Sequence, residues 1–289
     1  MINVVVLGSG DTILKILKKL NKDKEFSIKA IGTNKIPDNE IISFAKINQI
    51  TIVESLDNLK EIDFDFVYML SYAPLIEKHF LDKYLFINTH YAPLPRYRGF
   101  HGFVWCIING ESEAGFTIHK VEDGIDNGAI YYQYKKEIKE QDDVNSLIKF
   151  FEENLVENIK DILLKIYEGQ IPKIQNENEA IYVARRRLED NLISWNQSSR
   201  DIHNFIRALT PPYTEGAFTS FNNEKVNIIE TELLNTPAYT ERPGKIVNID
   251  KNGIWVKTKD SVLLVKKISS NGKFYNHNEL EIKIGQVFK

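Results

Sequence analysis

The chain has 289 residues, 43% of them hydrophobic, and a formal net charge of −3, which allows one large or two modest domains with a substantial core. This mildly acidic net charge argues against an overall electrostatic field that attracts nucleic acid. No apolar run approaches the roughly 20 residues of a membrane helix, and the single cysteine, Cys106, excludes an internal disulfide. The first residues lack the basic start and cleavage site of a signal peptide, so we expect a cytoplasmic protein with no membrane partner.

The N-terminal region alternates expected strands and helices. A strand at Ile2–Leu7 is followed by Gly8-Ser9-Gly10 and by a helix from Asp11 to Leu20 with aliphatic residues at helical spacing. This order is typical of a doubly wound α/β fold. The dinucleotide fingerprint G-x-G-x-x-G is incomplete, because its third glycine would fall at Ile13. The elements expected next are strands at Phe26–Ile31, Ile50–Val53 and Asp65–Leu70, and a helix at Asn39–Ile47.

The stretch that carries the chemistry begins with an expected buried strand, Phe86–His90. Side chains alternate along a strand, so Asn88 and His90 share one face. An amide that stabilises an oxyanion beside an imidazole that moves a proton suits acyl transfer. A second strand, Gly115–Val121, leads into a glycine-containing loop, where we expect Asp126 to orient His90 and to raise its pKa.

The rest of the chain is predicted in the same way. A helix at Phe103–Asn109, a strand at Ala129–Lys135 and a long amphipathic helix at Val144–Tyr167 follow the loops. A further helix, Asp201–Ala208, can be capped by Ser198 or Ser199. The strand-like runs after the Pro211-Pro212 break indicate a small β-barrel of OB type; they are Gly216–Phe221, Val226–Glu230, Gly244–Ile249, Ile254–Thr258 and Val262–Ile268.

Three segments in this order resemble the formyltransferases that use N10-formyltetrahydrofolate. They are Asn88-Thr89-His90, the loop Leu94-Pro95-Arg96-Tyr97-Arg98-Gly99, and Asp123-Gly124-Ile125-Asp126-Asn127-Gly128. Ala92 and Pro93 stand where the family usually has Ser and Leu. The resemblance covers nearly the whole chain and implies a Rossmann-like catalytic domain over residues 1–195, followed by a linker helix and an OB-like domain over 196–289.

The resemblance also implies roles for particular residues. The catalytic trio would be Asn88, His90 and Asp126. The residues implied for the folate co-substrate are Tyr72, Ala73, Pro74, Glu122, Asp123, Gly124, Ile125 and Asp126. Those expected at the acceptor substrate, less directly, are Arg96, Tyr97, Arg98, Trp105 and Arg185. No metal is expected, because the remaining histidines form no cluster with ligand spacing.

Two branches of this family carry the C-terminal barrel: methionyl-tRNA formyltransferases, and enzymes that formylate nucleotide-linked (dTDP-, UDP- or GDP-) amino sugars. The tRNA enzymes typically carry a basic insertion after the second strand, whereas Gly32–Glu40 is short and has no basic cluster here. The sequence therefore favours an amino-sugar N-formyltransferase in bacterial surface polysaccharide (lipopolysaccharide, O-antigen) synthesis, with no nucleic-acid partner and with dimerisation through the C-terminal region. A methionyl-tRNA formyltransferase, a silent ligand-binding homologue and an NAD-dependent oxidoreductase are the alternatives.

Overall fold

A computed structural model describes residues 1–34, 38–270, 272–276 and 281–289. Part of the Gly32–Glu40 segment, residues 35–37, therefore lies outside the described residues. The chain divides into two compact units. The first contains Met1–Gly102, Gly115–Lys136 and Lys149–Val183, and the second contains Phe103–Ala114, Glu137–Ile148 and Ala184–Lys289. The boundary expected after residue 195 stays a prediction. Across the described parts of the chain, no helix is both long and apolar enough to cross a membrane.

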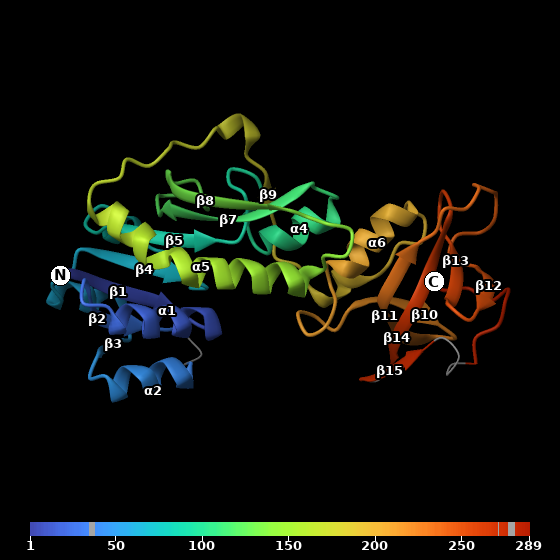
Figure 1. Ribbon diagram of the computed structural model, residues 1–289, viewed down its shortest axis with the longest axis horizontal. Coiled ribbons are helices and arrows are strands. Elements are labelled where there is room, and N and C mark those ends of the chain that lie inside the picture. Colours follow the sequence, from blue (N-terminus) through green and yellow to red (C-terminus); the bar gives the residue numbers. More distant parts are fainter. Residues whose placement is uncertain (35–37, 271, 277–280) are drawn as a thin grey trace. The chain divides into compact units, whose positions relative to one another are not determined.

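The first unit is built on a seven-stranded sheet with the order β3-β2-β1-β4-β5-β7-β8 (Figure 1). The strands from β3 to β5 are parallel, and β7 pairs with β5 in the antiparallel sense. This is the predicted Rossmann-like α/β architecture. The strand bounds are β1 Ile2–Gly8, β2 Phe26–Gly32, β3 Thr51–Val53, β4 Phe66–Leu70, β5 Phe86–His90, β7 Glu113–Lys120 and β8 Ile130–Glu137.

Helices cover both faces of this sheet, so its central strands read as continuous apolar runs. On one face, α1 (Asp11–Lys22) and α5 (Val144–Tyr167) lie side by side (Figure 1), joined by Lys160, whose Nζ is 2.9 Å from an Asp23 carboxylate oxygen. On the other face, a cluster that includes Val67 and Phe86 packs against η1 (Leu56–Glu61) and α3 (Lys78–Leu81). The remaining elements of this unit are α2 Asn39–Ile47, η1 Leu56–Glu61, α3 Lys78–Leu81, β6 Arg98–Gly99, η2 Glu177–Glu179 and β9 Tyr182–Val183.

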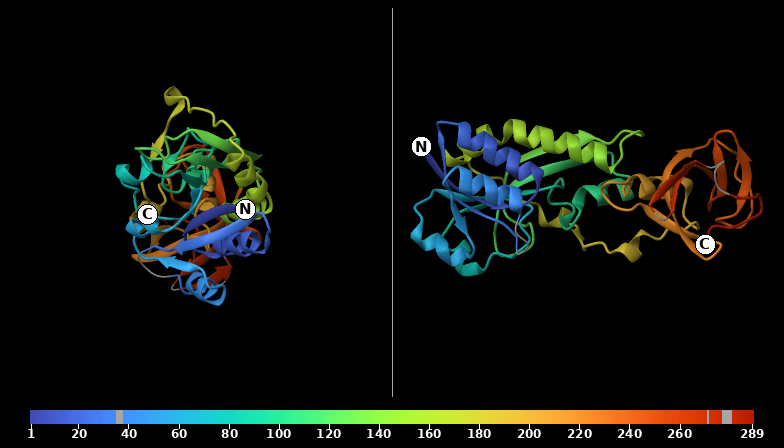
Figure 2. Two further views of the ribbon diagram at one scale, coloured as in Figure 1. Left: turned by 90° about the vertical axis from the view of Figure 1, so that its left-hand side faces the viewer. Right: turned by 90° about the horizontal axis from the view of Figure 1, so that it is seen from below.

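The second unit contains an antiparallel sheet with the order β10-β11-β14-β13-β12, and β15 pairs with β14 (Figure 2). Its helix α6 (Ser199–Arg207) begins after Ser198, whose hydroxyl accepts a hydrogen bond from the Asp201 amide. The antiparallel C-terminal domain is thus confirmed, while closure into an OB barrel stays a prediction. The other bounds are η3 Leu188–Asn191, β10 Ala217–Phe221, β11 Glu224–Leu233, β12 Ile246–Asp250, β13 Gly253–Lys257, β14 Val262–Ser270 and β15 Lys273–Asn276. Helix α4 (Gly102–Ile108) links the two units in sequence.

Candidate active site

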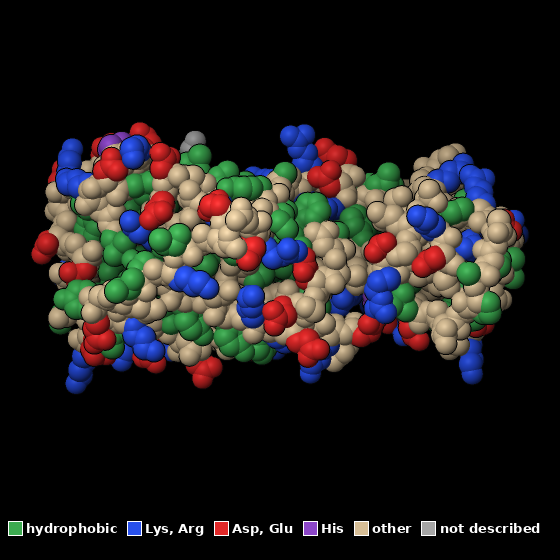
Figure 3. Space-filling model, turned by 90° about the horizontal axis from the view of Figure 1, so that it is seen from above, with side chains coloured by type: hydrophobic (Ala, Val, Ile, Leu, Met, Phe, Trp, Pro, Cys, Tyr) green, Lys and Arg blue, Asp and Glu red, His purple; other side chains and the backbone are tan. Residues whose placement is uncertain are grey.

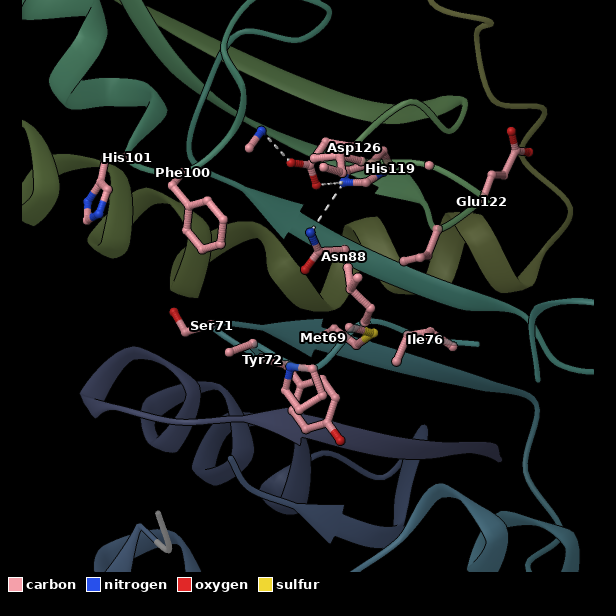
Figure 4. Close-up of a pocket in the computed structure, with 17 residues that line it drawn as sticks. Met69, Ser71, Tyr72, Ile76, Asn88, Phe100, His101, His119, Glu122 and Asp126 are labelled. Atoms are coloured by element: carbon pink, nitrogen blue, oxygen red, sulfur yellow. Dashed lines mark hydrogen bonds and ion pairs between the residues drawn. The ribbon is translucent and has the colours of Figure 1, made fainter. Parts of the chain in front are cut away.

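A pocket of about 400 Å³ opens in the first unit beside the carboxyl ends of β4 and β5 (Figure 4). Ligands of open α/β sheets bind at such strand ends. The walls are mostly apolar, whereas one side carries an amide, a carboxylate and an imidazole, and this combination is typical of small-molecule sites. The lining residues used below are Met69, Ser71, Tyr72, Ala73, Pro74, Leu75, Ile76, Asn88, Phe100, His101, His119, Val121, Glu122, Gly124, Ile125 and Asp126.

Strand register brings the polar groups of this site together. Asn88 on β5 lies directly opposite His119 on β7, and the Asn88 Nδ2 is 3.3 Å from the His119 Nε2. The same Nε2 is 3.4 Å from Oδ1 of Asp126, which belongs to the loop after β7. The other ring nitrogen of His119, Nδ1, donates to the Lys120 carbonyl at 2.7 Å. Figure 4 shows the contacts that run from Asn88 through His119 to Asp126 along one wall of the pocket.

His90 lies behind that wall and does not line the pocket. Its Nε2 donates to the Tyr97 carbonyl at 2.8 Å, and its Nδ1 is 3.5 Å from Oδ2 of Asp126. Burial lowers the pKa of His90, and the nearby Asp126 charge and Tyr97 carbonyl raise it only in part. The expected pairing of Asp126 with His90 is therefore present as a contact, but the net effect on the pKa of His90 is opposite to the rise expected from the sequence.

The Asp126 carboxylate contacts several groups of the site. It contacts both imidazoles, and its Oδ2 also accepts a hydrogen bond of 2.9 Å from the Gly99 amide. Burial alone would raise the pKa of this carboxyl, but the neighbouring His119 and His90 rings and the hydrogen bond from the Gly99 amide lower it to about 2. Asp126 is therefore a fixed negative charge at neutral pH.

The backbone around the pocket adopts conformations that L-amino acids rarely occupy. Ser71, Tyr97, His101 and Asp126 have φ angles of 54°, 62°, 59° and 48°. Three of these four residues line the pocket. Each such residue costs about 1–3 kcal/mol and persists only where its surroundings impose it, which is common at functional sites. The geometry thus points to function independently of any sequence motif.

The segment after β4 is held by a residue that the sequence did not single out. Asn34 donates from Nδ2 to the Ser71 carbonyl at 2.9 Å, and its Oδ1 accepts from the Ala73 amide at 2.8 Å. This bridge between the loops after β2 and β4 fixes the edge of the pocket. Because the Ala73 amide is already engaged, a backbone hydrogen bond from Ala73 to a ligand would use its carbonyl.

Seven of the eight residues predicted for the folate co-substrate line this pocket. The exception is Asp123, whose carbonyl accepts a hydrogen bond from the Asn127 side chain at 3.1 Å. The pocket also uses residues that the sequence did not flag. Among them are Phe100, whose side chain is 49% exposed, and Leu75, which is 84% exposed.

The predicted acceptor contact of Arg98 needs correction. Its side chain is fully buried, and its guanidinium forms a two-pronged ion pair with Glu177, with N–O distances of 2.6 and 2.9 Å. It also donates to Gln175 Oε1 and to the Tyr182 hydroxyl. A guanidinium whose donors are used in this way holds β6 against β9 and is not available to a diphosphate.

The other predicted acceptor residues fall in different places. Tyr97 is 1% exposed, and the Arg96 guanidinium lies 5.4 Å from the centre of its ring. Trp105 and Arg185 belong to the second unit, where the Arg186 guanidinium lies 5.0 Å from the centre of the Trp105 ring. Contacts of Arg96, Trp105 and Arg185 with a substrate stay predictions.

His119 is a further polar residue of the site that sequence reasoning missed, because an isolated histidine on a buried strand is usually structural. The available signal was strand pairing. An antiparallel partner of Phe86–His90 in the right register must place one side chain opposite Asn88. Among the described residues, no group of three or more His, Cys, Asp or Glu side chains is arranged to hold a metal ion.

Comparison with known proteins agrees with this architecture. The model of the family described as "Formyl transferase" matches residues 2–159, and that described as "Formyl transferase, C-terminal domain" matches residues 186–279. A methionyl-tRNA formyltransferase from Clostridium beijerinckii is 31% identical over an alignment that covers 98% of this chain and 99% of that protein.

Solved structures show the same fold at lower identity. One is WlaRD, a sugar 3N-formyl transferase whose structure was solved in the presence of dTDP and 5-N-formyl-THF. It is 21% identical to this chain with a TM-score of 0.73, and the match covers 94% of this chain and 99% of WlaRD. An N-formyltransferase from Helicobacter canadensis, in complex with folinic acid and dTDP-3-aminofucose, is 23% identical with a TM-score of 0.71 over 92% and 99% of the two chains. On these matches, which together extend over both units, the chain belongs to the formyl transferase family.

Proposed function

We propose that this protein transfers a formyl group from N10-formyltetrahydrofolate to the amino group of a nucleotide-linked amino sugar. The observation that carries formyl transfer is the Asn88 amide at the pocket wall, backed by Asp126 and two histidines. The apolar wall formed by Met69, Ile76 and Val121 suits the bicyclic ring of a folate, with the polar groups at its side. N10-formyltetrahydrofolate would supply the formyl carbon.

In this proposal the acceptor amine attacks the formyl carbon, the bond from that carbon to folate N10 breaks, and one amine proton moves to N10. Asn88 donates a hydrogen bond to the formyl oxygen as negative charge develops there; losing one such donor costs about 2.7–4 kcal/mol of barrier. His90 moves the proton. For this it must release one present partner, and its 3.5 Å contact with Asp126 is longer than its 2.8 Å hydrogen bond to Tyr97. Catalytic hydrogen bonds often tighten only when substrate binds.

The choice of an amino sugar rests on charge and loop length. The connection between β2 and α2 spans residues 33–38, with one lysine and no arginine in that segment. On the face drawn in Figure 3, Lys and Arg side chains are interspersed with Asp and Glu. A protein that grips an RNA stem needs a basic surface for its phosphates. The two sugar enzymes named above have the same fold, which is compatible with this acceptor.

Methionyl-tRNA is the second candidate acceptor, because three curated relatives at 31–33% identity are named methionyl-tRNA formyltransferase. The alignment with the Clostridium beijerinckii protein spans 318 positions, more than the 289 residues of this chain. That relative therefore has residues that this chain lacks. Loss of an insertion fits a change of acceptor on a retained catalytic core.

The test is an acceptor panel. The purified protein is mixed with N10-formyltetrahydrofolate and either nucleotide-linked amino sugars carrying dTDP, UDP or GDP, or formylatable Met-tRNA. Release of tetrahydrofolate and the product mass are followed. We expect one sugar to be formylated and the tRNA not; formylation of the tRNA alone would overturn the choice of acceptor and leave formyl transfer standing. Asn88→Ala should reduce kcat by about 10²–10³-fold, whereas the same change at the exposed Asn252 should leave it unchanged.

Since Arg98 is buried, Arg96 is the arginine of this loop that we propose to contact the diphosphate of the acceptor. Arg96→Gln should raise the KM for the nucleotide sugar and leave the KM for the formyl donor unchanged. An unchanged acceptor KM would remove Arg96 from the substrate site.

We place the reaction in bacterial surface polysaccharide synthesis and expect a cytoplasmic homodimer formed through the C-terminal region.

A further inference from the structure

We propose that His119 is a positioning residue for formyl transfer, acting through the Asn88 amide. It rests on the proposed transfer chemistry but not on the choice of acceptor. His119 has only 2% of its side chain exposed, so solvent does not compete for its ring. Its Nε2 lies 3.3 Å from the Asn88 Nδ2 and 3.4 Å from the Asp126 Oδ1, at the point where the amide meets the carboxylate.

The ring orientation of His119 is set by the backbone. Nδ1 can meet the Lys120 carbonyl at 2.7 Å only as a donor, because a carbonyl only accepts. Because the Asn88 Nδ2 can only donate, its 3.3 Å contact with the other ring nitrogen requires an Nε2 that carries no proton. That nitrogen accepts one of the two N–H bonds of the Asn88 amide, leaving the second N–H for an oxygen of a ligand.

Among the described residues, the contact with His119 is the hydrogen bond recorded for the Asn88 side chain, and it distinguishes the amide nitrogen from the amide oxygen. An amide turned by 180° would place an oxygen where the donor should be, next to the developing negative charge. A donor contributes to the rate only when it is aimed beforehand at the oxyanion position. His119 thus supplies orientation, while Asn88 supplies the hydrogen bond.

Two substitutions separate this role from a purely structural one. A glutamine side chain carries its amide close to the position of Nε2, so His119→Gln can still meet Asn88 and Asp126. An asparagine amide reaches only the position of Nδ1, so His119→Asn keeps the Lys120 contact and loses the other two. A residue needed only to anchor the strand end would be rescued by asparagine, and a positioning residue by glutamine.

The experiment measures kcat and both KM values for these variants with whichever acceptor the wild type uses. We expect His119→Asn to lower kcat by about 10- to 100-fold, which is less than the loss of the Asn88 donor itself, with little change in the KM for the formyl donor. His119→Gln should recover most of this loss. In an Asn88→Ala background, His119→Asn should have almost no further effect, because a double-mutant cycle exposes residues that act as one unit.

The proposal is overturned if His119→Asn is as active as wild type, if asparagine rescues better than glutamine, or if the His119 and Asn88 effects multiply. Thermal unfolding of each variant identifies any that fail to fold. The side-chain amide resonances of Asn88, assigned by their loss in Asn88→Ala, give a readout without turnover: they should move in His119→Asn and stay near their places in His119→Gln. A wild-type protein that formylates no acceptor would refute the proposed function, while these resonances would still decide the role of His119.

Discussion

Replacing Arg98 by methionine should destabilise the first unit rather than weaken substrate binding. The substitution removes the bidentate ion pair with Glu177 and both hydrogen bonds to Oε1 of Gln175, and Gln175 itself is only 6% exposed. Removing one partner of a buried ion pair costs about 3–5 kcal/mol. The Glu177 side chain is 67% exposed and regains water once it is released, so we expect the low end for Arg98→Met, about 3 kcal/mol.

Loss of the Arg98 side chain should also affect the active site, because Gln175 contacts both Arg98 and the Asp126 loop. The Gln175 Nε2 donates to the carbonyls of Asp126 and Gly128 at 2.8 and 2.7 Å. We therefore expect kcat to fall together with stability.

Thermal unfolding measures the effect directly. At about 2 °C per kcal/mol for a chain of this size, Arg98→Met should lower the Tm by about 6 °C. Arg187→Met, at a side chain that is 80% exposed, is the matched control and should change the Tm little. A Tm within about 2 °C of wild type, together with a raised KM for the acceptor, would refute this reasoning and return Arg98 to the substrate site.

Three further predictions concern protonation and close packing. A carboxyl with a folded pKa of about 2 stabilises the fold above its ordinary pKa near 3.8, so Asp126→Asn should lose about 2 kcal/mol at pH 7, and in urea titrations its deficit should vanish as the pH falls from about 4 to 2. Burial lowers the pKa of His203 to about 4, so stability should fall as the pH drops from about 6.5 to 4; His203→Asn, which can keep the hydrogen bond to Thr231, should flatten this slope. A Cβ on Gly128 would lie 1.9 Å from the Lys120 carbonyl oxygen, so Gly128→Ala should cost about 3 kcal/mol or more in thermal unfolding and displace Asp126.

The sequence was sufficient where a pattern is local. The helix Val144–Tyr167 was predicted to the residue, because Phe151, Leu155 and Ile159 recur at helical spacing and all three are buried. The parallel strands could also be predicted from their aliphatic runs, since both faces of such a sheet are covered. The OB-type closure of the C-terminal strands depends on pairings between distant segments and stays a prediction.

The candidate site divides along the same line. Alternation along one strand was enough to put Asn88 and His90 on one face, and motif order was enough to bring in Asp126. The sequence could not predict that Arg98 is buried, because nothing in the neighbouring residues distinguishes an exposed loop arginine from a buried arginine in an ion pair. Its burial follows from Glu177 and Gln175, nearly 80 residues further along the chain.

By itself, then, the amino-acid sequence determined the element types, the α/β order and the chemical groups of the site, because these depend on residue identity and short spacing. Tertiary structure alone decided which groups face the pocket: His119 lines it and His90 lies behind its wall. The physical reason is register. The antiparallel pairing of β5 with β7 sets His119 opposite Asn88, and the loop after β7 then delivers Asp126 between the two imidazoles.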